Sequence, residues 1–245
     1  MSHANEVAVI TGGQQGLGYN IAQRLASEGA TVVLFDLNAE KLAAASRKIS
    51  GSSFQVINVT DEKSVAAAFA NVVSQYGRLD ILVQAAGITG KTGITTDQVD
   101  ADNFDLVFAV NTKGVFLCCK HALPQMVKQD YGRIVNIASV SGKDGNAKML
   151  AYSGSKAAVI GITKVIGKEF AETGITVNAL APAVVKTAMV AALPDDRVKY
   201  MTNKIPMKRC GTVEEIAALV SFIAHKDASF TTGFTFDATG GRATY

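Results

Sequence analysis

A serine, a tyrosine and a lysine in the middle of the chain have the types and spacing needed for acid–base chemistry on an alcohol or a carbonyl. Tyr152 and Lys156 are four residues apart and share one face if this stretch is helical. A phenol ionises at about pH 10, and an ammonium one turn away favours the phenolate and lowers that pKa. Ser139 follows the apolar run Arg133–Ala138, a pattern typical of a buried strand, so its hydroxyl can hold a substrate oxygen at the strand end. Taken alone, the tyrosine–lysine spacing also fits a surface helix with a chance pair.

Three glycines follow the first apolar run of the chain. Gly12, Gly16 and Gly18 lie between a strand pattern that ends at Ile10 and a helical pattern that begins at Leu17. In this context glycines permit a tight turn and let backbone amides approach a pyrophosphate at the helix N-terminus. The spacing differs from the Gly-x-Gly-x-x-Gly dinucleotide fingerprint, but the strand–turn–helix context is the one that fingerprint requires. The pattern predicts a dinucleotide site, and a purely structural loop is the alternative.

An acidic residue, Asp36, ends the second strand pattern, eighteen residues beyond Gly18. A carboxylate there can accept hydrogen bonds from both adenosine ribose hydroxyls and would repel a 2′-phosphate. Gln14, Gln15 and Leu37 place no cation nearby to bind that phosphate. The pattern favours NAD over NADP, and a simple turn carboxylate is the other interpretation.

Strand and helix patterns alternate along the whole chain. Apolar runs predict strands at Val7–Ile10, Thr31–Phe35, Phe54–Ile57, Leu79–Val83, Arg133–Ala138, Ile175–Leu180 and Gly233–Phe236. Helical apolar spacing predicts helices at Leu17–Ser27, Asn38–Ile49, Thr60–Tyr76, Ala101–Gln129, Tyr152–Glu172 and Thr212–Ala224. Strands separated by helices pair in parallel, with helices on both faces of the sheet. No linker or repeat interrupts the pattern, so residues 1–245 are predicted to form a single α/β domain.

The composition limits the classes of protein to consider. The chain has 245 residues, of which 48% are hydrophobic and 18% charged, as in a compact protein. Its formal charge of +3, without a run of like charges, argues against a nucleic-acid partner. No apolar run approaches the roughly 20 residues of a membrane span, and the polar start carries no secretory signal. Cys118, Cys119 and Cys210 show neither a disulfide framework nor metal-ligand spacing, so we expect reduced cysteines, no metal and a cytoplasmic location.

In order and spacing these residues resemble the short-chain dehydrogenase/reductase family over essentially the whole chain. The matching positions are Thr11–Gly18, Asp36, Ala85, Ala86, Gly87, Asn111, Ser139, Tyr152, Lys156, Pro182 and Thr187. The resemblance implies a Rossmann-like, doubly wound fold with a seven-stranded, mostly parallel sheet. It also implies a catalytic tetrad. Tyr152 would be the acid/base, Ser139 would orient the reacting oxygen, Lys156 would bind the nicotinamide ribose, and Asn111 would hold a water of the proton relay.

The same resemblance implies a cofactor site for NAD. Its residues would come from the glycine turn, several strand ends and the catalytic helix: Gly12, Gln15, Gly16, Leu17, Gly18, Asp36, Leu37, Asn58, Val59, Ala85, Ala86, Gly87, Tyr152, Lys156, Pro182, Val185 and Thr187. Three positions depart from the family pattern. Gln84 replaces the Asn that usually opens the Asn-Ala-Ala-Gly turn, and Asn58 stands where an Asp often contacts the adenine amino group. Ala183 replaces the Gly of a Pro-Gly pair, and none of the three departures removes a catalytic group.

Residues from position 141 onward indicate which substrate is bound. Residues 184–210 resemble the mobile flap that closes over substrate in this family. The ending Thr239–Tyr245 is similar to the tail of a subgroup that oxidises 2-keto-3-deoxy sugar acids, such as 2-keto-3-deoxyfuconate, at the 4-hydroxyl. The candidate substrate contacts are Ser141, Asn146, Lys148, Met189 and Arg242. Lys148 is a candidate for facing a substrate carboxylate, and Arg242 for contacting an anion in a neighbouring subunit.

The predicted function is NAD-dependent interconversion of a secondary alcohol and a ketone, with a 2-keto-3-deoxy sugar acid as the candidate substrate. A general carbonyl or 3-oxoacyl reductase is the alternative enzyme, although Asp36 weakens it because biosynthetic reductases mostly use NADP. A catalytically idle NAD-binding sensor or scaffold is the non-enzyme alternative. Such proteins commonly lose the tyrosine or the lysine, and this chain keeps both. The resemblance further implies a homotetramer that packs through the helix around Val107–Ala122 and the helix of Tyr152.

Overall fold

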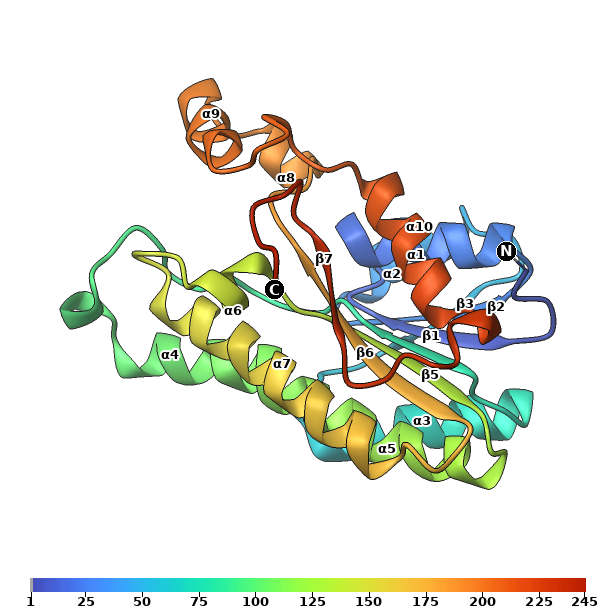
Figure 1. Ribbon diagram of the computed structural model, residues 1–245. Coiled ribbons are helices and arrows are strands. Elements are labelled where there is room, and N and C mark those ends of the chain that lie inside the picture. The colour runs from blue at the N-terminus through green and yellow to red at the C-terminus, as the bar shows by residue number, and fades with distance from the viewer. Residues whose placement is uncertain (1) are drawn as a thin grey trace.

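The computed structural model describes residues 2–245 and contains one seven-stranded sheet (Figure 1). The strand order is β3-β2-β1-β4-β5-β6-β7, and all neighbouring strands pair in parallel. The strands are β1 (Val7–Thr11), β2 (Thr31–Asp36), β3 (Ser53–Val56), β4 (Ile81–Gln84), β5 (Gly132–Ile137), β6 (Ile175–Pro182) and β7 (Thr235–Ala238). The central strands are buried from end to end, because helices cover both faces of a parallel sheet.

The helices divide into two layers (Figure 1). One layer holds α1 (Gly16–Ser27), α2 (Ala39–Ser46) and α10 (Val213–Ala224), and the other holds α3 (Glu62–Tyr76), α4 (Ala101–Phe108), α5 (Gly114–Lys128) and α7 (Leu150–Glu169). Each layer packs its own cluster of buried aliphatic side chains against one face of the sheet. Residues that alternate along a strand point into opposite clusters, as Ile10 and Val9 do.

Several boundaries differ from the predictions for local reasons. The fourth strand begins at Ile81 and not at Leu79, because the Leu79 backbone bonds to the side chain of Gln129 (2.7 and 3.3 Å). The last strand begins at Thr235, because Gly233 has φ +71° and belongs to the preceding turn. The structure adds three short helices that the sequence patterns missed: α6 (Val140–Asp144), α8 (Ala188–Ala191) and α9 (Asp195–Asn203).

The long helix predicted over 101–129 is continuous, but α4 and α5 are joined by a π-helical turn at Ala109–Lys113. Within residues 2–245 this stretch, Ala101–Lys128, is the one helix that is long and apolar enough to cross a membrane. Its inner face packs into the core through Val115, Leu117 and Met126. Cys118 and Cys119 are also buried there, and burial raises the pKa of the Cys119 thiol to about 12, so both behave as small apolar side chains.

Candidate active site

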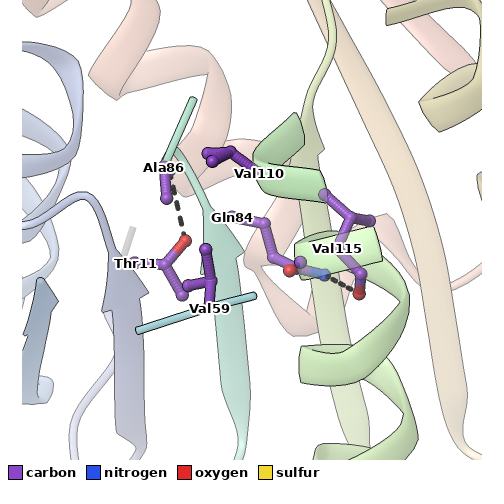
Figure 2. Close-up of a pocket in the computed structure, with 7 residues that line it drawn as sticks. Thr11, Val59, Gln84, Ala86, Val110 and Val115 are labelled. Atoms are coloured by element: carbon purple, nitrogen blue, oxygen red, sulfur yellow. Dashed lines mark hydrogen bonds between the residues drawn. The ribbon is translucent and has the colours of Figure 1, made fainter. Parts of the chain in front are cut away.

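The predicted catalytic and cofactor residues gather where the parallel strands end. β1 lies between β2 and β4, and in this strand order a crevice opens at the carboxyl ends of β1 and β4. The turns that follow these two strands are joined there. The Ala86 N–H donates to the Thr11 hydroxyl (3.2 Å) (Figure 2), and the Ala85 N–H donates to the Thr11 carbonyl (3.2 Å). Ligands of open parallel sheets bind in this kind of crevice.

The glycine turn after β1 has no room for side chains on its inner side. A Cβ on Gly12 would lie 2.7 Å from the Ala86 nitrogen, and a Cβ on Gly18 would collide with the Gly12 carbonyl. Gly16 has φ +60° and faces open space. Within residues 2–245, Gln15 at the start of α1 makes no side-chain capping bond to the first amides of the helix. These N–H groups remain available to an anion, so the turn fits the pyrophosphate of a dinucleotide.

Asp36 ends β2 beside the glycine turn. Its carboxylate accepts hydrogen bonds from the backbone N–H groups of Gln14 (3.2 Å) and Leu37 (2.8 Å). These two bonds fix the direction of the carboxylate. Each carboxylate oxygen keeps a further lone pair, which fits the pair of hydroxyls on an adenosine ribose.

Asn58 and Val59, which follow β3, have different surroundings. Val59 lines a small pocket together with Thr11, Gln84, Ala86, Val110, Gly114 and Val115 (Figure 2). The Asn58 Oδ1 atom instead accepts bonds from the N–H (3.0 Å) and the hydroxyl (2.9 Å) of Thr60. We expected this oxygen to accept a bond from the adenine amino group, but both of its lone pairs are engaged. The group left to meet an adenine is the Asn58 amide nitrogen, which is a donor.

Gln84 belongs to a buried polar network that the sequence did not indicate. Its amide nitrogen lies 3.0 Å from Asn136 Oδ1, 3.1 Å from Cys119 Sγ and 3.2 Å from the Val115 carbonyl oxygen (Figure 2). Asn136 in turn donates to the Thr163 hydroxyl (2.9 Å). The long side chain at position 84 therefore ties β4 to α5, β5 and α7, while Thr11 holds the following turn.

Asn111 lies in the π-helical turn between α4 and α5, a feature common at functional positions. Its amide oxygen accepts the Ile88 N–H (2.8 Å), and its amide nitrogen donates to the Ile88 carbonyl (2.8 Å) and the Ser155 hydroxyl (3.0 Å). A Cβ on Gly87 would lie 3.2 Å from Asn111 Oδ1 and 3.4 Å from Lys156 Nζ. The structure thus brings Gly87, Asn111 and Lys156 together.

Lys156 is a buried ammonium on α7. Its Nζ donates to the Ile137 carbonyl at the end of β5 (2.6 Å) and lies 6.0 Å from the centre of the Tyr152 ring. Loss of solvation lowers the Lys156 pKa to about 8. Close packing sets its position, since a Cβ on Gly142 would lie 2.6 Å from the Lys156 carbonyl carbon. Gly142 and Ser155 are therefore supporting residues that the sequence motifs do not include.

Burial of Lys156 predicts a pH-dependent stability. Between about pH 8 and 10.5 the unfolded chain holds the Lys156 proton more tightly than the folded chain does, so the free energy of unfolding rises with pH in this window. Lys156→Met should remove this component. We expect the unfolding free energy of wild type, minus that of Lys156→Met, to increase by about 2 kcal/mol from pH 7.5 to 10, measured by urea denaturation without cofactor.

Lys168→Met is the matched control, because Lys168 is exposed on the same helix. The difference between wild type and this variant should stay flat over the same pH range. A flat difference for Lys156→Met as well would mean that the ammonium keeps its solvation.

Ser139 and Tyr152 face each other across the end of β5. Ser139 begins α6, and its hydroxyl accepts the Ser141 N–H (3.1 Å). Burial raises the pKa of the Tyr152 phenol, and the hydrogen bond with Ser139 only partly opposes this effect. The expected lowering of the Tyr152 pKa by Lys156 is therefore wrong for the protein without ligands. The physical reason is that the phenolate loses solvation while the Lys156 ammonium is directed at the Ile137 carbonyl.

The remaining predicted cofactor residues lie after β6. Pro182 ends that strand, Val185 pairs with Gly211, and the Thr187 hydroxyl caps α8 by accepting the Val190 N–H (3.3 Å). Ala183 does not have a positive φ, so alanine is accommodated where the family usually has glycine. Its N–H donates to the Ala238 carbonyl (3.0 Å).

The five candidate substrate residues lie in different surroundings. Ser141 is a buried residue of α6, and the side chain of Met189 lies outside the described residues. Asn146 and Lys148 lie on the loop before α7, where the Lys148 backbone has a left-handed φ of +66°. Arg242 lies in its own subunit against α6, 3.2 Å from Asp144 Oδ2.

A family model described as enoyl-(acyl carrier protein) reductase matches residues 12–243. The chain is 45% identical to the 2-dehydro-3-deoxy-L-rhamnonate dehydrogenase (NAD(+)) of Sphingomonas sp. (strain SKA58), over 99% of this chain and 97% of that protein. It is 38% identical to the 3-oxoacyl-(acyl-carrier-protein) reductase of Thermotoga maritima, over 96% and 97% of the two chains.

Two solved structures are similar over nearly their full length. An NAD+-bound xylitol dehydrogenase has a TM-score of 0.93 and 31% identity, covering 98% of this chain and 100% of that one. A levodione reductase has a TM-score of 0.94 and 34% identity, covering 98% of each chain. The strand order, the glycine turn and the Ser139–Tyr152–Lys156 arrangement agree with these relationships. The chain belongs to the short-chain dehydrogenase/reductase family.

Proposed function

We propose that the protein is an NAD-dependent dehydrogenase that oxidises a secondary hydroxyl of a 2-keto-3-deoxy sugar acid. The observation that carries this proposal is the 45% identity, over 99% of the chain, to a dehydrogenase of a sugar acid of that class. Asp36 supports NAD as the cofactor, because its fixed carboxylate is suited to ribose hydroxyls and repels a 2′-phosphate. The cations Lys148 and Arg242 near the site are consistent with an anionic substrate.

The roles of the side chains follow from their positions. The Ser139 hydroxyl holds the substrate oxygen, and Tyr152 takes the hydroxyl proton in its ionised form, which the positive charge of a bound nicotinamide would favour. Lys156 supplies a positive charge at the base of the site. Asn111 holds the loop after β4 against helix α7 through its hydrogen bonds with Ile88 and Ser155. The chemistry that bound NAD would supply is a hydride acceptor for the carbinol carbon. In the reverse direction the Tyr152 hydroxyl returns its proton to the oxygen of the ketone.

A 3-oxoacyl thioester reductase is the second candidate, since relatives with that activity are 38–40% identical to the chain. Asp36 argues against this candidate, because biosynthetic reductases mostly use NADP and the Asp36 carboxylate repels the 2′-phosphate of that cofactor.

The residue range 184–210, which holds α8 and α9, serves as the substrate flap in either case. We place the whole of residues 1–245 in one domain, located in the cytoplasm.

The test is a rate assay of the purified protein with NAD+ and NADP+ in parallel at mildly alkaline pH. The substrates are 2-keto-3-deoxy sugar acids, 3-hydroxyacyl thioesters, simple secondary alcohols and vicinal diols. Turnover of a sugar acid with NAD+, at a kcat/KM at least tenfold above the others, is the expected result. Preferred turnover of a thioester with NADP+ would replace this function by the second candidate.

The quaternary structure is proposed to be a homotetramer. Large apolar side chains are exposed on the outer faces of α4, α5 and α7, namely Leu106, Phe116, Val127, Leu150 and Val165. A second exposed group surrounds β7 and includes Phe222, Phe230 and Phe234. Two such faces suit the two kinds of contact in a tetramer with dihedral symmetry. Sedimentation velocity at micromolar concentration should give a species of about four times the mass of the 25.6 kDa chain, and a single monomeric species would contradict the proposal.

A further inference from the structure

Three cations from separate parts of the chain lie near Tyr200 on α9. Lys148 comes from the loop before α7, Lys204 from the end of the flap helix α9, and Arg242 from the C-terminal tail. Tyr200 on α9 lies among them. The pKa of its phenol is lowered by a hydrogen bond with Lys204 and by the positive charges of Lys204, Arg242 and Lys148. The Lys204 ammonium also lies 4.5 Å from the centre of the Tyr200 ring.

One contact joins the flap to the site itself. Lys204 Nζ lies 3.3 Å from the side-chain oxygen of Asn146, which is 58 residues away in the sequence. The Asn146 N–H donates to the hydroxyl of Ser153, the residue next to Tyr152 (3.1 Å). The end of α9 is thus one side chain away from the turn of α7 that carries the proposed acid/base. Figure 1 shows α8 and α9 above the same edge of the sheet at which α6 begins and the chain ends.

The charges of this region are not balanced. Within residues 2–245, its two ion pairs are Lys143 with Asp237 (2.9 Å) and Arg242 with Asp144 (3.2 Å). Neither Lys148 nor Lys204 belongs to an ion pair of the described chain. Apart from the phenol and ring of Tyr200, the Lys204 ammonium meets a neutral amide oxygen, which is a weaker acceptor for an ammonium than a carboxylate.

We propose that Lys204 is the residue of the flap that recognises the carboxylate of the substrate, with Lys148 completing the anion site from the opposite side. This inference rests on the function proposed above and names the group that selects acids over neutral alcohols. A substrate carboxylate replaces the Asn146 oxygen as the acceptor for Lys204. Because Lys204 ends the flap helix, the same bond draws the flap over the reacting carbon, so charge recognition and closure are one event.

The test compares two substrates in variants of the full-length enzyme. The substrates are 2-keto-3-deoxy-L-rhamnonate and its methyl ester, which differ in the charge of the carboxyl group. Lys204→Gln should raise the KM for the acid at least tenfold and leave the KM for the ester and for NAD+ within twofold. Lys204→Arg, which keeps the charge, should restore the KM for the acid to within threefold of wild type.

Lys199→Gln is the control, because Lys199 is exposed on the same helix and its side chain makes no hydrogen bond or ion pair within the described residues. It should change neither KM more than twofold. An equal rise in KM for acid and ester in Lys204→Gln would mean that the residue only supports the fold of the flap, and no rise for either would also overturn the inference. If wild type oxidises neither compound while another alcohol is turned over, the proposed function fails first and the inference with it.

Discussion

Replacing Tyr152 by phenylalanine should lower kcat for alcohol oxidation by about a thousandfold or more. A positioned acid/base contributes about 10² to 10⁴ to the rate, and Tyr152 is the phenol that the structure pairs with Ser139 at the end of β5. The substitution removes one oxygen atom and keeps the ring in place, so the fold should be unchanged. The measurement is the steady-state rate of NADH formation with the best substrate of the panel.

Binding measurements distinguish this result from a general loss of structure. Titration of Tyr152→Phe with NADH, followed by fluorescence, should give a Kd within threefold of wild type. Tyr76→Phe is the matched control, because the Tyr76 hydroxyl bonds to Ser53 (2.8 Å), away from the crevice. Its kcat should be unchanged. A Tyr152→Phe enzyme with near wild-type turnover would remove Tyr152 from the mechanism and reopen the alternative of an NAD-binding sensor.

Neutralising Asp36 should reverse much of the cofactor preference. Asp36→Asn keeps an acceptor oxygen for only one of the Gln14 and Leu37 amides, which donate to different carboxylate oxygens, and it removes the charge that repels a 2′-phosphate. Hydrogen bonds to a charged acceptor contribute about 1.5–3 kcal/mol, so kcat/KM for NAD+ should fall by about 30-fold. With the repulsion gone, kcat/KM for NADP+ should rise. The expected change in the ratio of the two values is about 10² or more.

Glu40→Gln is the control for this experiment. Glu40 lies in the first turn of α2, four residues after Asp36 at the end of β2, so it tests the effect of removing one negative charge nearby. Its NAD+/NADP+ ratio should stay within twofold of wild type. An unchanged ratio in Asp36→Asn would mean that the carboxylate serves only the turn between β2 and α2.

The sequence alone determined the fold class and the positions of the reactive side chains. Runs such as Ile175–Leu180 and the helical spacing after Tyr152 are local properties, since alternating elements of this kind can bury their apolar faces only around a parallel sheet. The spacing of Tyr152 and Lys156 follows directly from the helical repeat. The dinucleotide turn was predictable because its glycines are needed by the backbone itself, as the Gly12–Ala86 approach illustrates.

The tertiary structure decided what no local pattern contains. The contacts of Gln84 with Asn136 and of Lys204 with Asn146 join residues 52 and 58 positions apart, so they depend on how distant segments pack. The direction of the Tyr152 pKa shift was mispredicted for the same reason. Helical spacing indicates that two charged groups are neighbours, but solvation and the orientation of each polar head are set by the residues that surround them. The placement of Arg242 on Asp144 of its own subunit is likewise a result of chain packing.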